Sequence, residues 1–100
     1  MIVVVGYITI DPAKRTEIEA AIAAVVTATT AEDGNIDYRY SHDVLEANRI
    51  NIVEFWESED AMNFHMGTQH LADFMTVAGG AIAGPVEIVR HDISSSTKIF

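Results

Sequence analysis

The 100-residue sequence has a formal net charge of −9 and no cysteine, and 49% of its residues are hydrophobic. This length fits one domain, and the lack of cysteine excludes disulfides and thiolate chemistry. The six basic residues are scattered, which argues against nucleic-acid binding, because phosphate recognition needs clustered Lys and Arg. The hydrophobic fraction is high for a small monomer, so we expect a partner chain to cover part of the surface.

The first half of the chain predicts a strand, a helix and a second strand. Residues 2–10 are rich in Val and Ile, as in a strand buried on both faces. They are too few to cross a membrane and lack the basic start of a signal peptide, so we expect a cytoplasmic protein. Asp11 and Pro12 predict a helix start, and Glu32-Asp33-Gly34-Asn35 predicts the turn that ends it. The apolar face of this helix comprises Ile18, Ala21, Ile22, Val25, Val26 and Thr29.

The second strand alternates, with Ile36, Tyr38, Tyr40 and His42 on one face. A third strand is predicted from Ile50 to Trp56, with Ile50, Ile52, Glu54 and Trp56 sharing a face. Ser58 is expected to cap a helix that Gly67-Thr68 interrupts and Gly79-Gly80 ends. Residues 85–93 predict a fourth strand.

The order β-α-β-β-α-β predicts an α+β, ferredoxin-like fold, in which helices cover one face of an antiparallel sheet. We expect a single domain over residues 1–93 and a C-terminal tail over 94–100. Because the strands carry apolar residues on both faces, a second copy of the chain is the expected cover for the other face.

His65 and His70 are five residues apart on either side of Gly67. Zinc-binding helices space two histidines four residues apart, about 40° around the helix, whereas five residues give about 140°. No third ligand is evident nearby, so we predict no metal site. Both histidines could be ordinary helix-end residues, and His65 could instead act in catalysis.

The stretch Glu54-x-Trp56-Glu57-Ser58-x-x-Ala61-Met62-x-x-His65-x-x-Thr68-x-His70-x-x-x-Phe74 resembles the antibiotic biosynthesis monooxygenase (ABM) domain family, including its quinol monooxygenase-like members. Glu32-x-Gly34-Asn35-Ile36-x-Tyr38 is similar to the turn of that family into its second strand. The resemblance covers about residues 2–92. It implies a homodimer of facing sheets, the dimeric α+β barrel, with a pocket between sheet and helices in each subunit.

The resemblance also implies oxidation of a small quinol or polyphenolic aromatic by dioxygen, with no metal, flavin or other cofactor. In this reading His65, Trp56 and Glu54 are catalytic: His65 takes a phenolic proton, Trp56 offers ring surface, and Glu54 orients or charges His65. The substrate would be bound by Tyr38, Ile52, Met62 and Phe74. His65 is expected to point into the pocket beside Trp56, and His70 to lie outside it or at its rim, so that His70→Ala changes turnover little.

The sequence departs from the residue patterns of two branches of the family, and these departures limit which activities are expected. Ile52 and Met62 stand where the polyketide-pathway monooxygenases of the family carry Asn and Tyr. The haem-degrading branch has other residues at His65, Met75 and near Gly6, so haem cleavage is not expected. A non-catalytic small-molecule-binding protein of the same fold therefore stays an alternative to the enzyme.

Plainer roles are open as well. Trp56, Tyr38 and Tyr40 could be packing residues, and Glu54 could form an ion pair with Arg90 of the fourth strand. The C-terminal tail could be disordered.

Overall fold

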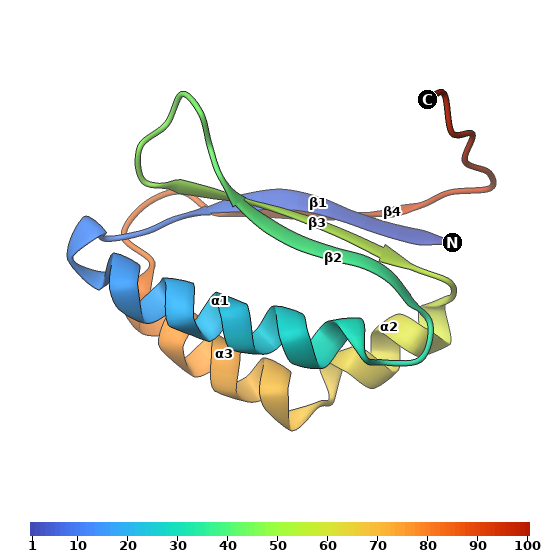
Figure 1. The fold of residues 1–100 in the computed structure, drawn as a ribbon, viewed down its shortest axis with the longest axis horizontal. Coiled ribbons are helices and arrows are strands. Elements are labelled where there is room, and N and C mark those ends of the chain that lie inside the picture. The colour runs from blue at the N-terminus through green and yellow to red at the C-terminus, as the bar shows by residue number, and fades with distance from the viewer.

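The computed structural model describes residues 1–100 as one antiparallel sheet with all of its helices on one face (Figure 1). The strands are β1 (Ile2–Thr9), β2 (Asn35–His42), β3 (Arg49–Trp56) and β4 (Glu87–Asp92). They lie in the order β2-β3-β1-β4, and every neighbouring pair is antiparallel. This arrangement confirms the predicted α+β, ferredoxin-like fold.

The helical segments are η1 (Pro12–Lys14), α1 (Arg15–Thr30), α2 (Glu59–Met66) and α3 (Gln69–Ala81). Asp11 caps the short 3₁₀ turn η1 by accepting a hydrogen bond from the Ala13 N–H, and α1 begins three residues after Pro12. Ser58 caps α2 as predicted, accepting from the Ala61 N–H. Gly67 separates α2 from α3, and Thr68 caps α3. None of these helices is both long and apolar enough to span a membrane.

The prediction that Gly79-Gly80 ends the last helix is wrong, because α3 continues to Ala81. Glycine costs a helix about 1 kcal/mol relative to alanine but does not forbid it. Ala78 and Ala81 are buried against the core, and this packing holds the final turn in place. The helix ends where Ile82 becomes extended and pairs with Ile10, and the Asp11 N–H donates to the Ala81 carbonyl.

The core lies between the helices and the inner face of the sheet. Figure 1 shows α1 and α3 side by side beneath the strands. Ile18 and Val25 of α1 are fully buried, as are Ile50 and Trp56 of β3. The expected inner face of β3 is therefore confirmed, and so is the apolar face of α1, with Ile18, Val25 and Thr29 buried and its other members partly buried.

Ile36 departs from the expected alternation of β2. It is 50% exposed, whereas Tyr38 is buried. The register shifts between Asn35 and Asp37, so this end of the strand carries a bulge and two residues stand opposite one. The bulge therefore directs Ile36 away from the inner face of the sheet, where Tyr38 lies.

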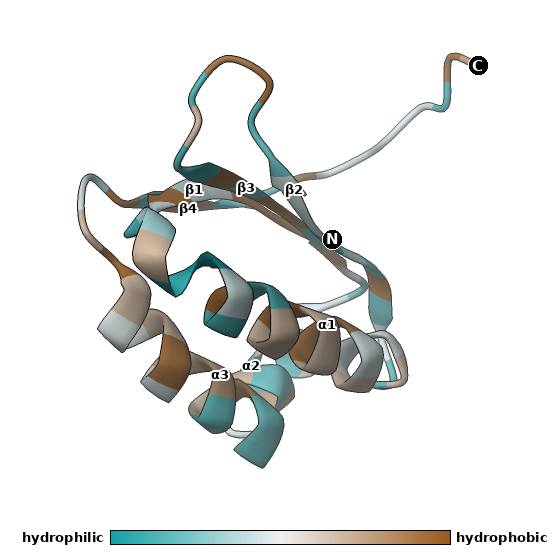
Figure 2. Cartoon of the chain, turned by 60° about the vertical axis from the view of Figure 1, so that its left-hand side comes forward, coloured by the Kyte–Doolittle hydropathy of each residue, from teal (hydrophilic) through white to brown (hydrophobic).

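No element of the chain covers the outer face of the sheet (Figure 1). This face is apolar at its centre, where Val5 pairs with both Val53 and Val89, and Val3 pairs with Phe55. Two segments project on the same side: the β2–β3 loop over 43–48 and the C-terminal tail over 94–100 (Figure 1). The loop carries hydrophobic residues at its tip (Figure 2), with Val44 and Leu45 almost fully exposed.

Candidate functional site

A cavity of about 310 Å³ lies between the inner face of the sheet and helices α2 and α3. Its walls are mostly apolar, and its titratable members are Tyr38, Tyr40, Glu54 and His65. The four residues expected to bind substrate all line it: Tyr38, Ile52, Met62 and Phe74.

The polar groups gather at one end of this cavity. Tyr38 and Glu54 are paired across β2 and β3, and Val4 completes their row on β1. The next row contains Tyr40 and Ile52, paired across the same two strands. The rest of the lining carries no ionisable group and includes Ile8, Ile82, Val86 and Ile88.

His65 closes the last turn of α2 and belongs to the polar end of the cavity. Its side chain is only 2% exposed. Its ring centroid lies 4.7 Å from that of Trp56 and 5.3 Å from that of Tyr38. The imidazole therefore lies on the cavity side beside Trp56, where the sequence predicted it.

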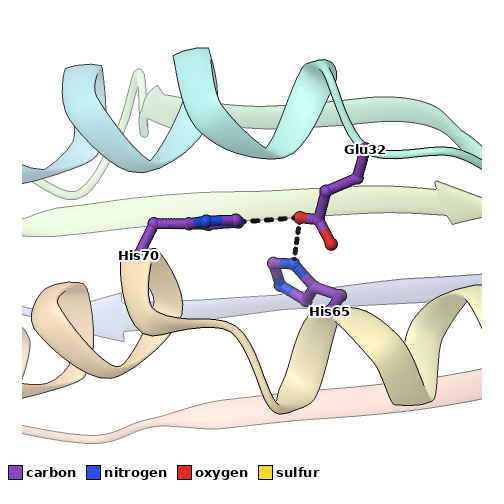
Figure 3. Close-up of side chains that lie close together, drawn as sticks. All are labelled: Glu32, His65 and His70. Atoms are coloured by element: carbon purple, nitrogen blue, oxygen red, sulfur yellow. Dashed lines mark hydrogen bonds and ion pairs between the residues drawn. The ribbon is translucent and has the colours of Figure 1, made fainter.

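Both histidines next to the α2–α3 break contact one carboxylate oxygen of Glu32 (Figure 3). Glu32 Oε2 lies 2.8 Å from His65 Nδ1 and 2.9 Å from His70 Nε2. An ionised carboxylate only accepts hydrogen bonds, so each imidazole donates an N–H to it. In neutral His65 the proton is then on Nδ1, and Nε2, which forms no hydrogen bond within the chain, is free to accept a proton from a ligand.

The turn after α1 places Glu32 between the two histidines. The Glu32 N–H donates to the Thr29 carbonyl, and the Glu32 carbonyl accepts from the Asn35 N–H. Gly34 has a φ of +83°, a conformation that favours glycine. A Cβ at Gly34 would also lie 2.5 Å from the Cβ of Ala61 in α2. The glycine thus lets the turn pack directly on the helix that carries His65.

Trp56 is fully buried and does not line the cavity. Its indole Nε1–H donates to Glu54 Oε1 at 3.0 Å, so Glu54 holds the tryptophan. Glu32, and not Glu54, accepts the hydrogen bond from His65. The expectation that Glu54 orients this histidine is therefore wrong. The suggested Glu54–Arg90 ion pair is also absent, because Arg90 pairs with Glu59 and Asp92.

Burial raises the pKa of Glu54, and the indole hydrogen bond offsets only part of this effect. Burial likewise raises the pKa of Tyr38, and it raises the pKa of Tyr40 to about 12. Both phenols therefore stay protonated at neutral pH. Their hydroxyl oxygens lie 3.2 Å apart, so one donates to the other and a single O–H is left for a ligand.

His70 lies in the first turn of α3, outside the cavity, with 28% of its side chain exposed. This position agrees with the expectation from sequence. The hydrogen bond from His70 to Glu32, however, could not be predicted from the sequence. Glu32 is separated from His65 by 33 positions and from His70 by 38. Two signals pointed to the turn that holds Glu32, its acidic residues and its similarity to the family's turn, but neither indicated a contact with the histidines.

Comparison with known proteins places the chain in a family. The family profile described as "Antibiotic biosynthesis monooxygenase" (ABM) matches residues 1–77. The chain belongs to the antibiotic biosynthesis monooxygenase family. This confirms the resemblance seen in the sequence.

Individual relatives of this ABM chain match over nearly its full length. It is 34% identical to the Bacillus subtilis protein named "Putative monooxygenase YcnE", over 94% of this chain and 99% of the relative. A crystal structure from Caulobacter crescentus, titled as a "putative antibiotic biosynthesis monooxygenase", is 29% identical with a TM-score of 0.82, covering 94% of this chain and 90% of the other. The structure of Rv0793 from Mycobacterium tuberculosis shares the fold with a TM-score of 0.87 at 22% identity, over 97% and 98% of the two chains.

Proposed function

We propose that this ABM protein is an oxidoreductase, a monooxygenase that oxidises a small quinol or polyphenolic aromatic with dioxygen and without a bound cofactor. One observation carries the proposal: His65 lines an apolar cavity while its Nδ1 is held by the buried Glu32 carboxylate. This arrangement leaves Nε2 as a proton acceptor beside the space where a ring would bind.

The chemistry begins with proton transfer from a phenolic O–H of the substrate to His65 Nε2. The resulting anion is electron-rich enough to pass one electron to dioxygen, and recombination of the two radicals forms a carbon–oxygen bond. For a quinol the balance is quinol plus O₂ giving hydroxyquinone plus water. The quinol supplies four electrons, one oxygen atom enters the ring, and the other leaves as water.

Other residues would support this step without exchanging protons. Glu32 is a positioning residue that holds the imidazole through its hydrogen bond to Nδ1. The remaining O–H of the Tyr38–Tyr40 pair can donate to a substrate oxygen, since burial keeps both phenols protonated. The apolar walls around Ile52, Met62 and Phe74 would exclude water from the reactive anion.

A homodimer and a cytoplasmic location form part of the same proposal. The uncovered outer face, with Val5 and Val89 each at least 40% exposed, supports a second copy as its cover. Sedimentation equilibrium tests the assembly: we expect a dimer at micromolar concentration. A stable, folded monomer under those conditions would contradict it.

The alternative function is a non-catalytic small-molecule-binding protein of the same fold. It is favoured by Ile52 and Met62, which give the cavity hydrocarbon and thioether groups where some family members carry Asn and Tyr. Such a protein would still bind a flat ring among the apolar walls.

Oxygen consumption across a panel of quinols and anthrone-like phenols distinguishes the two functions. Uptake of oxygen by the protein freed of metals and flavins, faster than the uncatalysed reaction, supports the enzyme. Saturable binding of the same compounds without oxygen uptake supports the binding protein.

A further inference from the structure

We propose that Glu32, His65 and His70 form a binding site for one divalent transition-metal ion. The sequence predicted no metal here because the two histidines lacked a third ligand. The fold supplies that ligand from the turn after α1 (Figure 3). The site stands independently of the proposed oxidation.

Three ligand atoms converge from three segments of the chain. One atom from each of Glu32, His65 and His70 can be chosen so that all lie within 4.8 Å of one another. The carboxylate oxygen already lies 2.8 and 2.9 Å from the two imidazole nitrogens. Zn²⁺ binds such atoms at about 2.0–2.2 Å, which spaces tetrahedral ligands roughly 3.3–3.6 Å apart. Accepting the ion therefore requires each Glu–His separation to widen by about half an ångström, and the two imidazole nitrogens, which lie within 4.8 Å of one another, to approach by up to about 1.5 Å.

Burial and charge provide a second, separate argument. The Glu32 side chain is 5% exposed, and its only ion-pair partners are the two imidazoles, with no Lys or Arg among them. Its other oxygen, Oε1, is buried without any hydrogen-bond partner. A buried carboxylate needs a positive charge and a full set of partners, and a bound cation supplies both.

The ligand types indicate which ions would bind. Two imidazoles and one carboxylate suit Zn²⁺, Co²⁺, Fe²⁺ or Cu²⁺, whereas Mg²⁺ and Ca²⁺ prefer oxygen ligands. Three protein ligands leave at least one coordination position for water. His70 is partly exposed and gives the ion a path from solvent.

Metal binding would change the chemistry of His65, a consequence that rests on the proposed function. A metal on Nδ1 leaves the single remaining ring proton on Nε2. The imidazole then presents a donor to the cavity and can no longer accept a phenolic proton. Zn²⁺ at this site should therefore suppress oxidation of the quinol while it stabilises the fold.

Calorimetric titration with Zn²⁺ tests the site on the chelator-treated full-length protein. We expect one ion per chain, and Glu32→Gln or His70→Ala should weaken its binding by roughly 100-fold or more, since loss of merely supporting groups already costs 10- to 100-fold. The matched control is His42→Ala, which removes the other His–Glu pair of the chain, between His42 Nε2 and Glu19 at 2.7 Å. This control should bind Zn²⁺ as the unchanged protein does.

A measurement on the unchanged protein removes any dependence on how the variants fold. In a histidine-selective NMR spectrum, Zn²⁺ should shift the ring signals of His65 and His70 and leave those of His42 and His91 in place. The site is refuted by no binding at millimolar Zn²⁺, by equal binding in all variants, or by shifts confined to the two other histidines. If the protein binds Zn²⁺ but its metal-free form oxidises no quinol, the proposed enzyme is refuted and the metal site is left standing.

Discussion

Glu32 Oε2 accepts a hydrogen bond from His65 Nδ1 at 2.8 Å although 33 sequence positions separate the two residues. The contact is almost fully shielded from water, with side-chain exposures of 5% and 2%. It determines which imidazole nitrogen faces a ligand, and so it links the turn after α1 to the chemistry expected in the cavity.

The first prediction concerns turnover. His65→Ala should lower the turnover number by about 10²- to 10⁴-fold, the usual contribution of a positioned proton acceptor. Glu32→Gln should also lower it, because an amide can donate to Nδ1 and move the ring proton to Nε2. His70→Ala should have a smaller effect than His65→Ala, since His70 lies outside the cavity.

Steady-state oxygen uptake measures these effects, and circular dichroism verifies that each variant is folded. His42→Ala serves as the control and should keep full activity. Equal losses for His65→Ala and His70→Ala would show that His65 is not the proton acceptor.

The second prediction uses the two adjacent glycines of α3. Gly79 lines the cavity and Gly80 does not, and a Cβ at either position meets no atom within 4 Å. Gly79→Leu should therefore intrude on the cavity and weaken ligand binding, whereas Gly80→Leu should leave it unchanged. Both substitutions should raise the melting temperature of the ligand-free protein, because leucine favours a helix over glycine by up to about 1 kcal/mol. Ligand titration and thermal melts compare the pair, and equal affinities would place the ligand elsewhere.

The third prediction concerns the turn that carries Glu32. Gly34→Ala should reduce the free energy of unfolding by at least about 1–2 kcal/mol, the cost of a left-handed conformation for a residue with a Cβ. The close approach to Ala61 adds to this cost. Gly67→Ala is the control, since Gly67 has a φ of −99° and a Cβ there would meet only the Phe64 carbonyl oxygen at 3.7 Å. Denaturant unfolding measures both, and a Gly34→Ala protein as stable as the control would contradict the argument.

The fourth prediction follows from the buried carboxyl of Glu54. Because burial raises its pKa in the folded state above the ordinary value for a glutamate, the native chain holds this proton to higher pH than the unfolded chain does. Its contribution to stability is complete below the unfolded pKa and is lost as pH rises through the folded pKa.

Glu54→Gln should flatten that decline, because the amide stays neutral and can still accept from the Trp56 indole. Unfolding free energies measured from pH 4 to 7 test this, with Glu57→Gln at an exposed neighbouring position as the control. A slope identical to that of the unchanged protein would show that Glu54 is not responsible.

Features that depend on local sequence were predictable. The caps at Asp11 and Ser58 and the interruption at Gly67 need only a few neighbouring residues, and the inner face of β3 follows from alternation. Features set by distant contacts were not. Helix α3 passes through Gly79-Gly80 because Ala78 and Ala81 pack on the core, and Ile36 turns outward because of a bulge against β3.

The candidate site divides in the same way. Its wall residues Tyr38, Ile52, Met62 and Phe74 were found through strand faces and the family motif. Glu32 was missed because its role depends on where a turn, a helix end and a helix start meet in space. The sequence of the acidic turn has no periodicity that would predict the contacts of Glu32 with the two histidines.

The uneven polarity of the cavity bears on which compounds it accepts. The row of Tyr38 and Glu54 and the nearby His65 carry ionisable groups, whereas the lining residues Ile82, Val86 and Ile88 are apolar, so a bound molecule has one preferred direction. We expect an amphipathic ligand, whose hydroxylated ring edge faces β2 and whose apolar side lies toward β4. Sugars and amino acids, which are polar on all sides, should be rejected by the desolvation cost of their far end.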